Sequence, residues 1–204
     1  MIYEIRTYDL RPGSLAEVEK RFAEKLPGRQ SLSPLAGFWH SEIGLLNQVV
    51  HIWPYDDLSH RANVREQATS GDWPPDISEF IVNMQSEIFM PAPFMAPMVE
   101  RSIGPMYEMR TYTYPSAGAI RQVLEAWGNA IAEREKLSPL AGCWYSEIGG
   151  LNRFVHLWAY RSFEERGRIR TETQQRGIWP PRSGVTAVRM ENKLLLPASF
   201  SPMQ

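Results

Sequence analysis

The sequence predicts an α+β fold in which one unit of about a hundred residues occurs twice and the two antiparallel sheets join into a barrel. Residues 32–55 return as residues 137–160, with 17 of 24 positions identical. Residues 3–8, YEIRTY, return as YEMRTY at 107–112, and the Trp-Pro-Pro at 73–75 returns at 179–181. The third observation is the order of strand and helix patterns within each copy, justified element by element below.

The repeat spacing, 104 to 106 residues, is long enough for each copy to form a small domain with its own core. Two copies in one chain can reproduce the contacts of a symmetric homodimer, so we expect a pseudo-twofold arrangement. The expected division is a first domain at 1–96, a linker at 97–105 bounded by Pro97 and Pro105, and a second domain at 106–204.

The composition is that of a folded protein, with 43% hydrophobic residues, 22% charged residues and a net charge of −1. The chain contains no basic run that would bind a phosphate backbone, so no nucleic acid is expected as a partner. The longest apolar runs fall short of the roughly 20 residues of a membrane span. Residues 3–8 follow Met1 and Ile2 with no leader-like segment, and Cys143 is a lone cysteine, so a cytoplasmic protein is expected.

The first half of each copy reads as a strand followed by a helix. Residues 2–8 alternate and are rich in β-branched and aromatic side chains, which predicts a strand. Ser14 and Glu17 form a capping-box pattern before apolar residues at helical spacing, which predicts a helix over 14–27.

The second half of each copy reads as a hairpin, a helix and a last strand. Residues 37–44 and 48–55 predict a hairpin that turns at Asn47, and residues 57–69 predict a helix, for which Ser162 and Glu165 supply a capping box in the second copy. Alternation over 80–90 predicts the final strand. This βαββαβ order is the ferredoxin-like plan, with both helices on one face of a four-stranded sheet.

The third strand divides its side chains between two faces. Alternation puts Val50 and Ile52 on one face, where we expect the helices, and His51 and Trp53 on the other. We expect the histidine-bearing faces of the two copies to meet across a cavity between the sheets. The ligand-binding candidates there are Glu4, Arg6, Glu42, His51 and Trp53, repeated as Glu108, Arg110, Glu147, His156 and Trp158.

Two further sets of candidates repeat in both copies. Arg61 and Arg65, repeated as Arg166 and Arg170, lie four apart on a helix and suit a carboxylate or phosphate at the cavity mouth, or else salt bridges. Trp73 and Trp179, each before two prolines, are either rigid lids on the cavity or plugs at the sheet edge.

A purely structural interpretation accounts for the same residues. Glu4 and Arg6 would form an ion pair, and His51 would donate to Glu42 or to a backbone carbonyl. Retention in both copies does not separate the two interpretations, because packing and ligand binding would each constrain both halves.

Standard catalytic signatures are absent from the sequence, including a Gly-rich phosphate loop, paired metal-binding histidines and a nucleophile elbow. One histidine per half beside Glu42 is a weak metal pattern, so neither a metal nor a cofactor is predicted. Haem on His51 or His156 is the one cofactor left open.

The motifs resemble those of the NIPSNAP family: a YEIRTY-like strand, a Trp-x-Ser-Glu-x-Gly-x-x-Asn hairpin leading into His-x-Trp-x-Tyr, an Arg-rich helix and a Trp before the last strand. The resemblance covers both halves and implies a dimeric α+β barrel, an architecture that also includes small monooxygenases. The positions that carry it are Trp39, Glu42, Gly44, Asn47, His51, Trp53, Tyr55, Arg61, Arg65 and Trp73, with Trp144, Glu147, Gly149, Asn152, His156, Trp158, Tyr160, Arg166, Arg170 and Trp179.

Three hypotheses follow. The leading one is a protein that binds a small, largely apolar molecule with a polar or anionic end, oriented by Arg6, Glu42 and His51. The second is a cofactor-independent or haem-dependent monooxygenase-like enzyme in which His51 or His156 acts as base, donor or axial ligand. The third is a protein-interaction scaffold. The sequence leaves open whether a reaction is catalysed and whether the tandem chain forms a homo-oligomer.

Overall fold

The computed structural model describes residues 1–204 and shows two βαββαβ units. The first unit contains β1 (Ile2–Leu10), α1 (Leu15–Gln30), β2 (Gly37–Ile43), β3 (Gln48–Tyr55), α2 (Leu58–Thr69), a short 3-10 turn (Ser78–Phe80) and β4 (Ile81–Pro91). The second unit contains β5 (Met106–Thr113), α3 (Ala117–Glu135), β6 (Leu140–Ile148), β7 (Arg153–Tyr160), α4 (Phe163–Gln175) and β8 (Arg189–Pro197).

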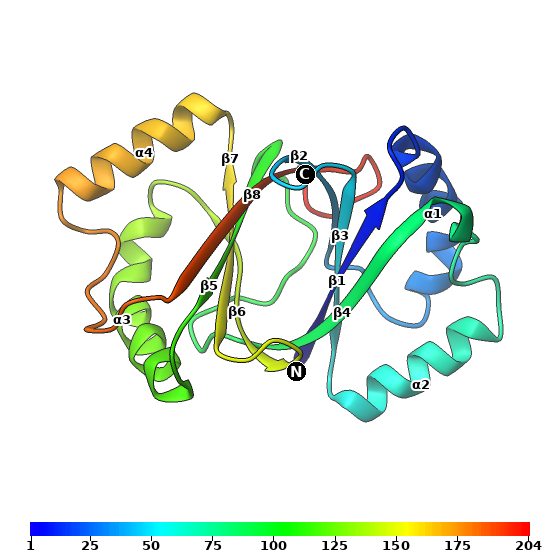
Figure 1. The fold of residues 1–204 in the computed structure, drawn as a ribbon, viewed down its shortest axis with the longest axis horizontal. Coiled ribbons are helices and arrows are strands. Elements are labelled where there is room, and N and C mark those ends of the chain that lie inside the picture. The colour runs from blue at the N-terminus through cyan, green and yellow to red at the C-terminus, as the bar shows by residue number, and fades with distance from the viewer.

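The eight strands form one closed barrel in the order β1-β3-β2-β8-β5-β7-β6-β4, which confirms the predicted fold class. The sheets join where β2 pairs with β8 and where β4 pairs with β6. The helices α1 and α2 cover the outside of one sheet, and α3 and α4 cover the outside of the other (Figure 1). No helix is long and apolar enough to cross a membrane.

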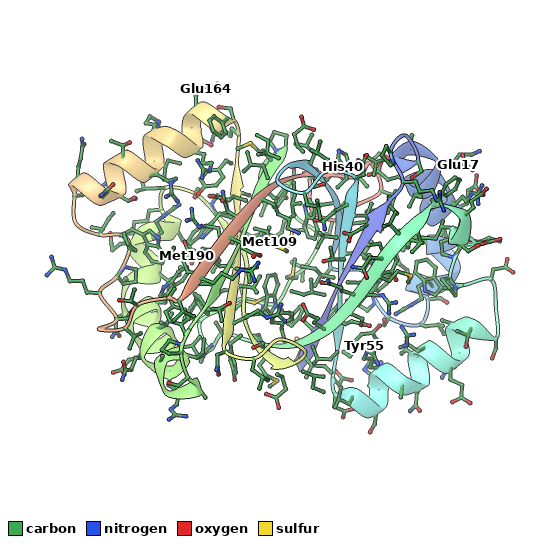
Figure 2. The ribbon with its side chains drawn as sticks, in the orientation of Figure 1. Glu17, His40, Tyr55, Met109, Glu164 and Met190 are labelled. Atoms are coloured by element: carbon green, nitrogen blue, oxygen red, sulfur yellow. The ribbon has the colours of Figure 1, made fainter.

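The interior of the barrel is filled by large apolar side chains from both sheets (Figure 2). Trp39 lies with its ring centroid 5.4 Å from that of Tyr107, and Tyr3 lies 5.8 Å from Trp144 in the mirrored contact. All four side chains are at most 1% exposed. Such rings pack at native density only when the surrounding strands supply small partners.

Gly37 and Gly142 are those small partners. The ring of Trp39 lies directly over Gly37, and the ring of Trp144 lies over Gly142, so that a Cβ on either glycine would overlap the indole. The repeated Ala-Gly-x-Trp of the two copies is therefore explained by packing inside the barrel.

The strand faces point the opposite way from our expectation. Val50 and Ile52 belong to the interior cluster, whereas Trp53 packs in a separate cluster with Val18 and Phe22 of α1. His51, which shares the face of Trp53, therefore lies under the helices, and the predicted placement between the sheets is wrong. Alternation identified the two sets of side chains, but both sets are buried, so periodicity could not tell which faces inward.

The last strand of each copy extends into the other half. β4 pairs with β1 along most of its length and then with β6, and Phe94 beyond it stacks on Trp127 of α3 at 6.4 Å. In the mirrored crossing, Phe200 follows β8 and packs 4.9 Å from Phe38. Residues 92–96 therefore belong to the first copy in sequence, but Ala92, Phe94 and Met95 pack against the core of the second half.

The first helix differs from its prediction at both ends. Ser14 makes no side-chain cap, because its hydroxyl donates to the carbonyl of Arg11 instead. The helix also continues through Pro27 to Gln30, three residues beyond the predicted end. The additional turn includes Arg29, which is buried and belongs to the site described next. Ser162 caps its helix as predicted, accepting from the N–H of Glu165, but the Glu165 carboxylate accepts from the N–H of Arg161 rather than from that of Ser162.

Candidate functional site

Two cavities lie between the sheets and the helices, one in each half of the molecule. The first, of about 340 Å³, lies under α1 and α2, and the second, of about 560 Å³, lies under α3 and α4. The shared hollow that we expected inside the barrel is occupied by the aromatic cluster instead. The site is therefore duplicated rather than formed jointly by both halves.

Most of the predicted residues line these two cavities. The first cavity is lined by Glu4, Arg6, His51, Trp53, Arg65 and Trp73, and the second by Glu108, Arg110, His156, Trp158, Arg166, Arg170 and Trp179. Arg61 lies behind the wall of the first cavity, where it bonds Glu4. Glu42 and Glu147 are exposed near the ends of β2 and β6 and belong to neither cavity, so their predicted place in the site is wrong. Strand pairing shifts register beside Glu42, which separates it from the buried face.

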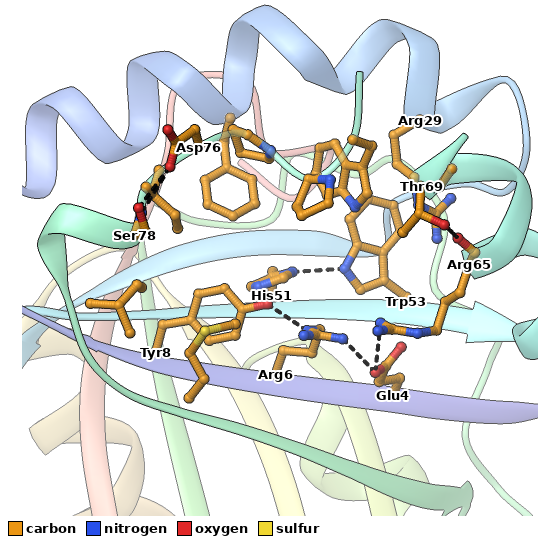
Figure 3. A pocket seen from close by; sticks show the side chains of 18 of the residues that line it. Glu4, Arg6, Tyr8, Arg29, His51, Trp53, Arg65, Thr69, Asp76 and Ser78 are labelled. Carbon is orange, nitrogen blue, oxygen red and sulfur yellow. Dashed lines mark hydrogen bonds and ion pairs between the residues drawn. The ribbon is translucent and has the colours of Figure 1, made fainter. Parts of the chain in front are cut away.

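The two histidines are held in one tautomer by tryptophan. The indole Nε1 of Trp53 donates to Nδ1 of His51 at 2.7 Å (Figure 3). Trp158 donates to His156 in the same way at 2.9 Å. An indole nitrogen can only donate, so Nδ1 must carry a lone pair and the proton of the neutral ring sits on Nε2. The partner of His51 is therefore Trp53, not Glu42 or a backbone carbonyl as the structural interpretation proposed.

The environment keeps both histidines neutral. Burial, reinforced by the positive charge of Arg6, lowers the pKa of His51 to about 3. Burial also lowers the pKa of His156 well below its usual value, with Arg110 adding to the effect. The Nε2 atoms of both rings are buried and have no hydrogen-bond partner in the protein. Each half thus carries one buried, unpaired N–H donor on a histidine that lines its cavity.

Glu4 is the centre of an ion-pair network on the sheet floor. Its carboxylate accepts from Arg61 at 2.7 Å, Arg6 at 2.9 Å and the hydroxyl of Ser86 at 2.5 Å. Burial raises the pKa of Glu4, but these donors outweigh it and lower the pKa to about 2. The ion pair with Arg6 was expected under the structural interpretation. Glu108 repeats the pattern with Arg166 at 2.6 Å.

Two buried arginines at the site were not predicted. Arg29 and Arg134 are 3% and 2% exposed, and neither has a carboxylate within salt-bridge distance. Each guanidinium lies 4.2 Å above an indole, that of Trp53 or Trp158, and donates to the hydroxyl of Tyr55 or Tyr160. The sequence did contain a signal, because both arginines stand three residues before the repeated LSPLAG.

Aromatic rings form the remaining walls of the first cavity. Trp73 lies 5.5 Å from Phe22 and 5.7 Å from Trp53, measured between ring centroids, so it lines the cavity. Tyr8 lies edge-on to His51 at 4.9 Å, and its hydroxyl accepts from Arg6 at 2.6 Å. In Figure 3 the aromatic rings surround the space above the Glu4–Arg6 floor.

The site is poorly suited to hold a metal or haem through its histidines. No group of three His, Cys, Asp or Glu side chains is arranged for a metal ion. An imidazole that ligates through Nε2 needs its proton on Nδ1, usually donated to a carboxylate or carbonyl. Here Nδ1 of His51 and of His156 faces a donor, which favours the opposite tautomer.

Comparison with known proteins decides the family. The NIPSNAP family model matches residues 3–96 and again 107–202. The chain belongs to the NIPSNAP family. Its NIPSNAP relatives include human NipSnap homolog 3A, 30% identical over all of this chain and 86% of that protein. The Dictyostelium discoideum NipSnap homolog is 33% identical over 98% of this chain and 88% of its own length.

The barrel of this NIPSNAP chain is also found outside the family. A Lactobacillus acidophilus protein provisionally assigned as a monooxygenase has a TM-score of 0.71 over 97% of this chain and 94% of its own, at 10% identity. That likeness shows the fold alone. Among the NIPSNAP motif positions, Trp39 is a barrel-interior residue and Asn47 adopts a positive φ in the hairpin turn. His51 and Trp53 form the hydrogen-bonded pair in the cavity.

Proposed function

We propose that this NIPSNAP chain binds a small, flat, largely apolar molecule with an anionic end in each of its two cavities. The observation that carries the proposal is the unpaired Nε2–H of His51 and of His156, buried at a cavity wall. A buried donor without a partner is costly, roughly 1 to 3 kcal/mol, and rare in native proteins. A ligand oxygen in the cavity would supply the missing acceptor.

The walls indicate the body of the ligand. Trp53, Trp73, Phe22 and Tyr8 surround the first cavity, and Trp127 takes the place of Phe22 in the second. Aromatic walls bury the faces of a flat molecule and add favourable ring contacts beyond the area buried.

The charges indicate the end group. Arg29 lies buried at the first cavity without an acidic partner, and Arg65 lies 3.9 Å from the nearest oxygen of Glu4, which already accepts from shorter bonds. Guanidinium groups in such surroundings favour a carboxylate or a related anion. A scaffold protein would not require a buried guanidinium that lacks a carboxylate partner.

The proposal is tested by calorimetry with benzoate, a flat carboxylate, and with benzamide as its uncharged counterpart. Benzoate should bind and benzamide should bind at least about tenfold more weakly, because only benzoate offers an anion to the arginines. The double variant His51→Phe with His156→Phe keeps the ring volume but removes the donor, so benzoate affinity should fall by about tenfold.

The matched control is His40→Phe. His40 lies outside the cavities and contacts Glu19 at 2.7 Å, so this change should leave benzoate affinity unaltered. Benzoate binding that is absent, or that survives the double histidine variant unchanged while that variant loses stability, would favour the scaffold hypothesis.

A further inference from the structure

The two cavities share a scaffold but differ in charge. Three arginines and two carboxylates line the first cavity: Arg6, Arg29, Arg65, Glu4 and Asp76. Four arginines and one carboxylate line the second: Arg110, Arg134, Arg166, Arg170 and Glu108. The second cavity therefore carries the larger excess of positive charge. We infer that the second cavity is selective for an organic phosphate, whereas the first takes a singly charged anion. This inference rests on the proposed function.

The mouths of the cavities differ in the same direction. Asp76 follows the Trp-Pro-Pro of the first copy, and Arg182 occupies the matching position in the second. Arg182 lies between Pro181 and Ser183, which both line the second cavity, whereas Asp76 itself lines the first. The charge beside the first cavity thus disfavours a dianion, and the charge beside the second favours one.

Unsatisfied donors are concentrated in the second cavity. The Nε atoms of Arg110, Arg134 and Arg166 are buried without a hydrogen-bond partner. In the first half, the Nε of Arg6 is satisfied by the hydroxyl of Tyr8, and Arg61 is the one arginine whose Nε is both fully buried and unpaired. Oε2 of Glu108 is the one buried carboxylate oxygen of the second site that has no partner.

A phosphate group uses such donors better than a carboxylate does. It has three terminal oxygens and a charge close to −2 above its second pKa of about 6. Planar guanidinium groups bind it through paired N–H donors. The second cavity is also larger, and Thr171 and Thr186 in its lining carry hydroxyls that are not engaged in other hydrogen bonds.

The test is calorimetry with phenyl phosphate at about pH 8, where it is a dianion, alongside benzoate. Phenyl phosphate should bind about one site per chain, and Arg170→Met should weaken it by about tenfold, whereas the mirrored Arg65→Met should change it less than about twofold. Arg170 makes no salt bridge, so its removal leaves the fold intact. Arg168→Met is the matched control, because Arg168 is 62% exposed on the same helix and outside the cavity.

A reciprocal exchange tests the mouth charge. Arg182→Asp should lower the affinity for phenyl phosphate by about tenfold. Asp76→Arg should raise the affinity of the first cavity for phenyl phosphate by about tenfold and so give the chain a second phosphate site. Equal losses from Arg65→Met and Arg170→Met, or no effect of either exchange, would overturn the inference. If benzoate still binds in that case, the proposed function survives; if neither probe binds either cavity, both proposals fail.

Discussion

The barrel interior and the helix-covered cavities are built from alternate residues of the same strands, yet they are packed in opposite ways. In the interior, Trp39 and Trp144 fill the space between the sheets and only their indole nitrogens lack a partner. In the cavities, charged groups surround open volume, and the lining residues His51 and His156 each keep a buried donor without a partner. The difference is consistent with an interior that contributes stability and with the proposed binding role of the cavities, which the following predictions address.

The largest effect is expected in the barrel interior. Trp39→Ala removes a fully buried indole and should cost about 3 to 5 kcal/mol in the free energy of unfolding, measured by urea denaturation. Trp73→Ala, at the partly exposed cavity wall, should cost about 1 to 2 kcal/mol and weaken benzoate binding instead. Similar losses of stability at both positions would remove the distinction between the two regions.

The next effect is expected at the floor of the first cavity. The pKa of Glu4 is lowered from 4.5 to about 2, so its ionisation contributes about 3 kcal/mol of stability. Because the folded-state pKa is the lower one, this stability is complete above about pH 4.5 and is lost as the pH falls toward 2.

The variant Glu4→Gln should therefore be less stable than the parent at neutral pH and should lose less stability between about pH 5 and 2. Unfolding followed by circular dichroism across this range measures both. Glu42→Gln, on an exposed carboxylate, is the control and should stay within about 0.5 kcal/mol. Parallel pH profiles for the parent and Glu4→Gln would contradict the network.

The smallest effect is expected in the pH dependence of binding. His51, with a pKa of about 3, stays neutral from pH 8 down to pH 5, so benzoate affinity should be nearly constant over this range. Calorimetric titrations at several pH values measure it. A transition near pH 6.5 would mean that the histidine is charged in the free protein and that its bond from Trp53 is broken.

Arg29 shows why part of the site escaped prediction. The helical spacing of apolar residues ends at Leu26, so the predicted first helix stopped at Pro27, two residues short of Arg29. The second copy has no proline there, and α3 runs through Arg134 to Glu135. Aligning the two copies would have extended the first helix to include Arg29 and placed both arginines at equivalent positions of α1 and α3.

Glu42 shows the opposite error. Strict alternation puts it on the same strand face as Phe38, which stacks on His51. That face is covered only as far as the helix reaches, and the register of β2 changes beside Glu42. Periodicity predicts which face of the sheet a side chain occupies, but it does not predict how far the helices cover that face.

The sequence by itself determined the duplicated βαββαβ unit, the closed barrel and the sets of side chains that share a strand face. Only the tertiary structure decided which set fills the barrel and which lies under the helices, and therefore where His51 and His156 are. The physical reason is that both faces of each sheet are apolar enough to be buried. The choice depends on volume, since Trp39 and Trp144 fit against Gly37 and Gly142 only in the interior.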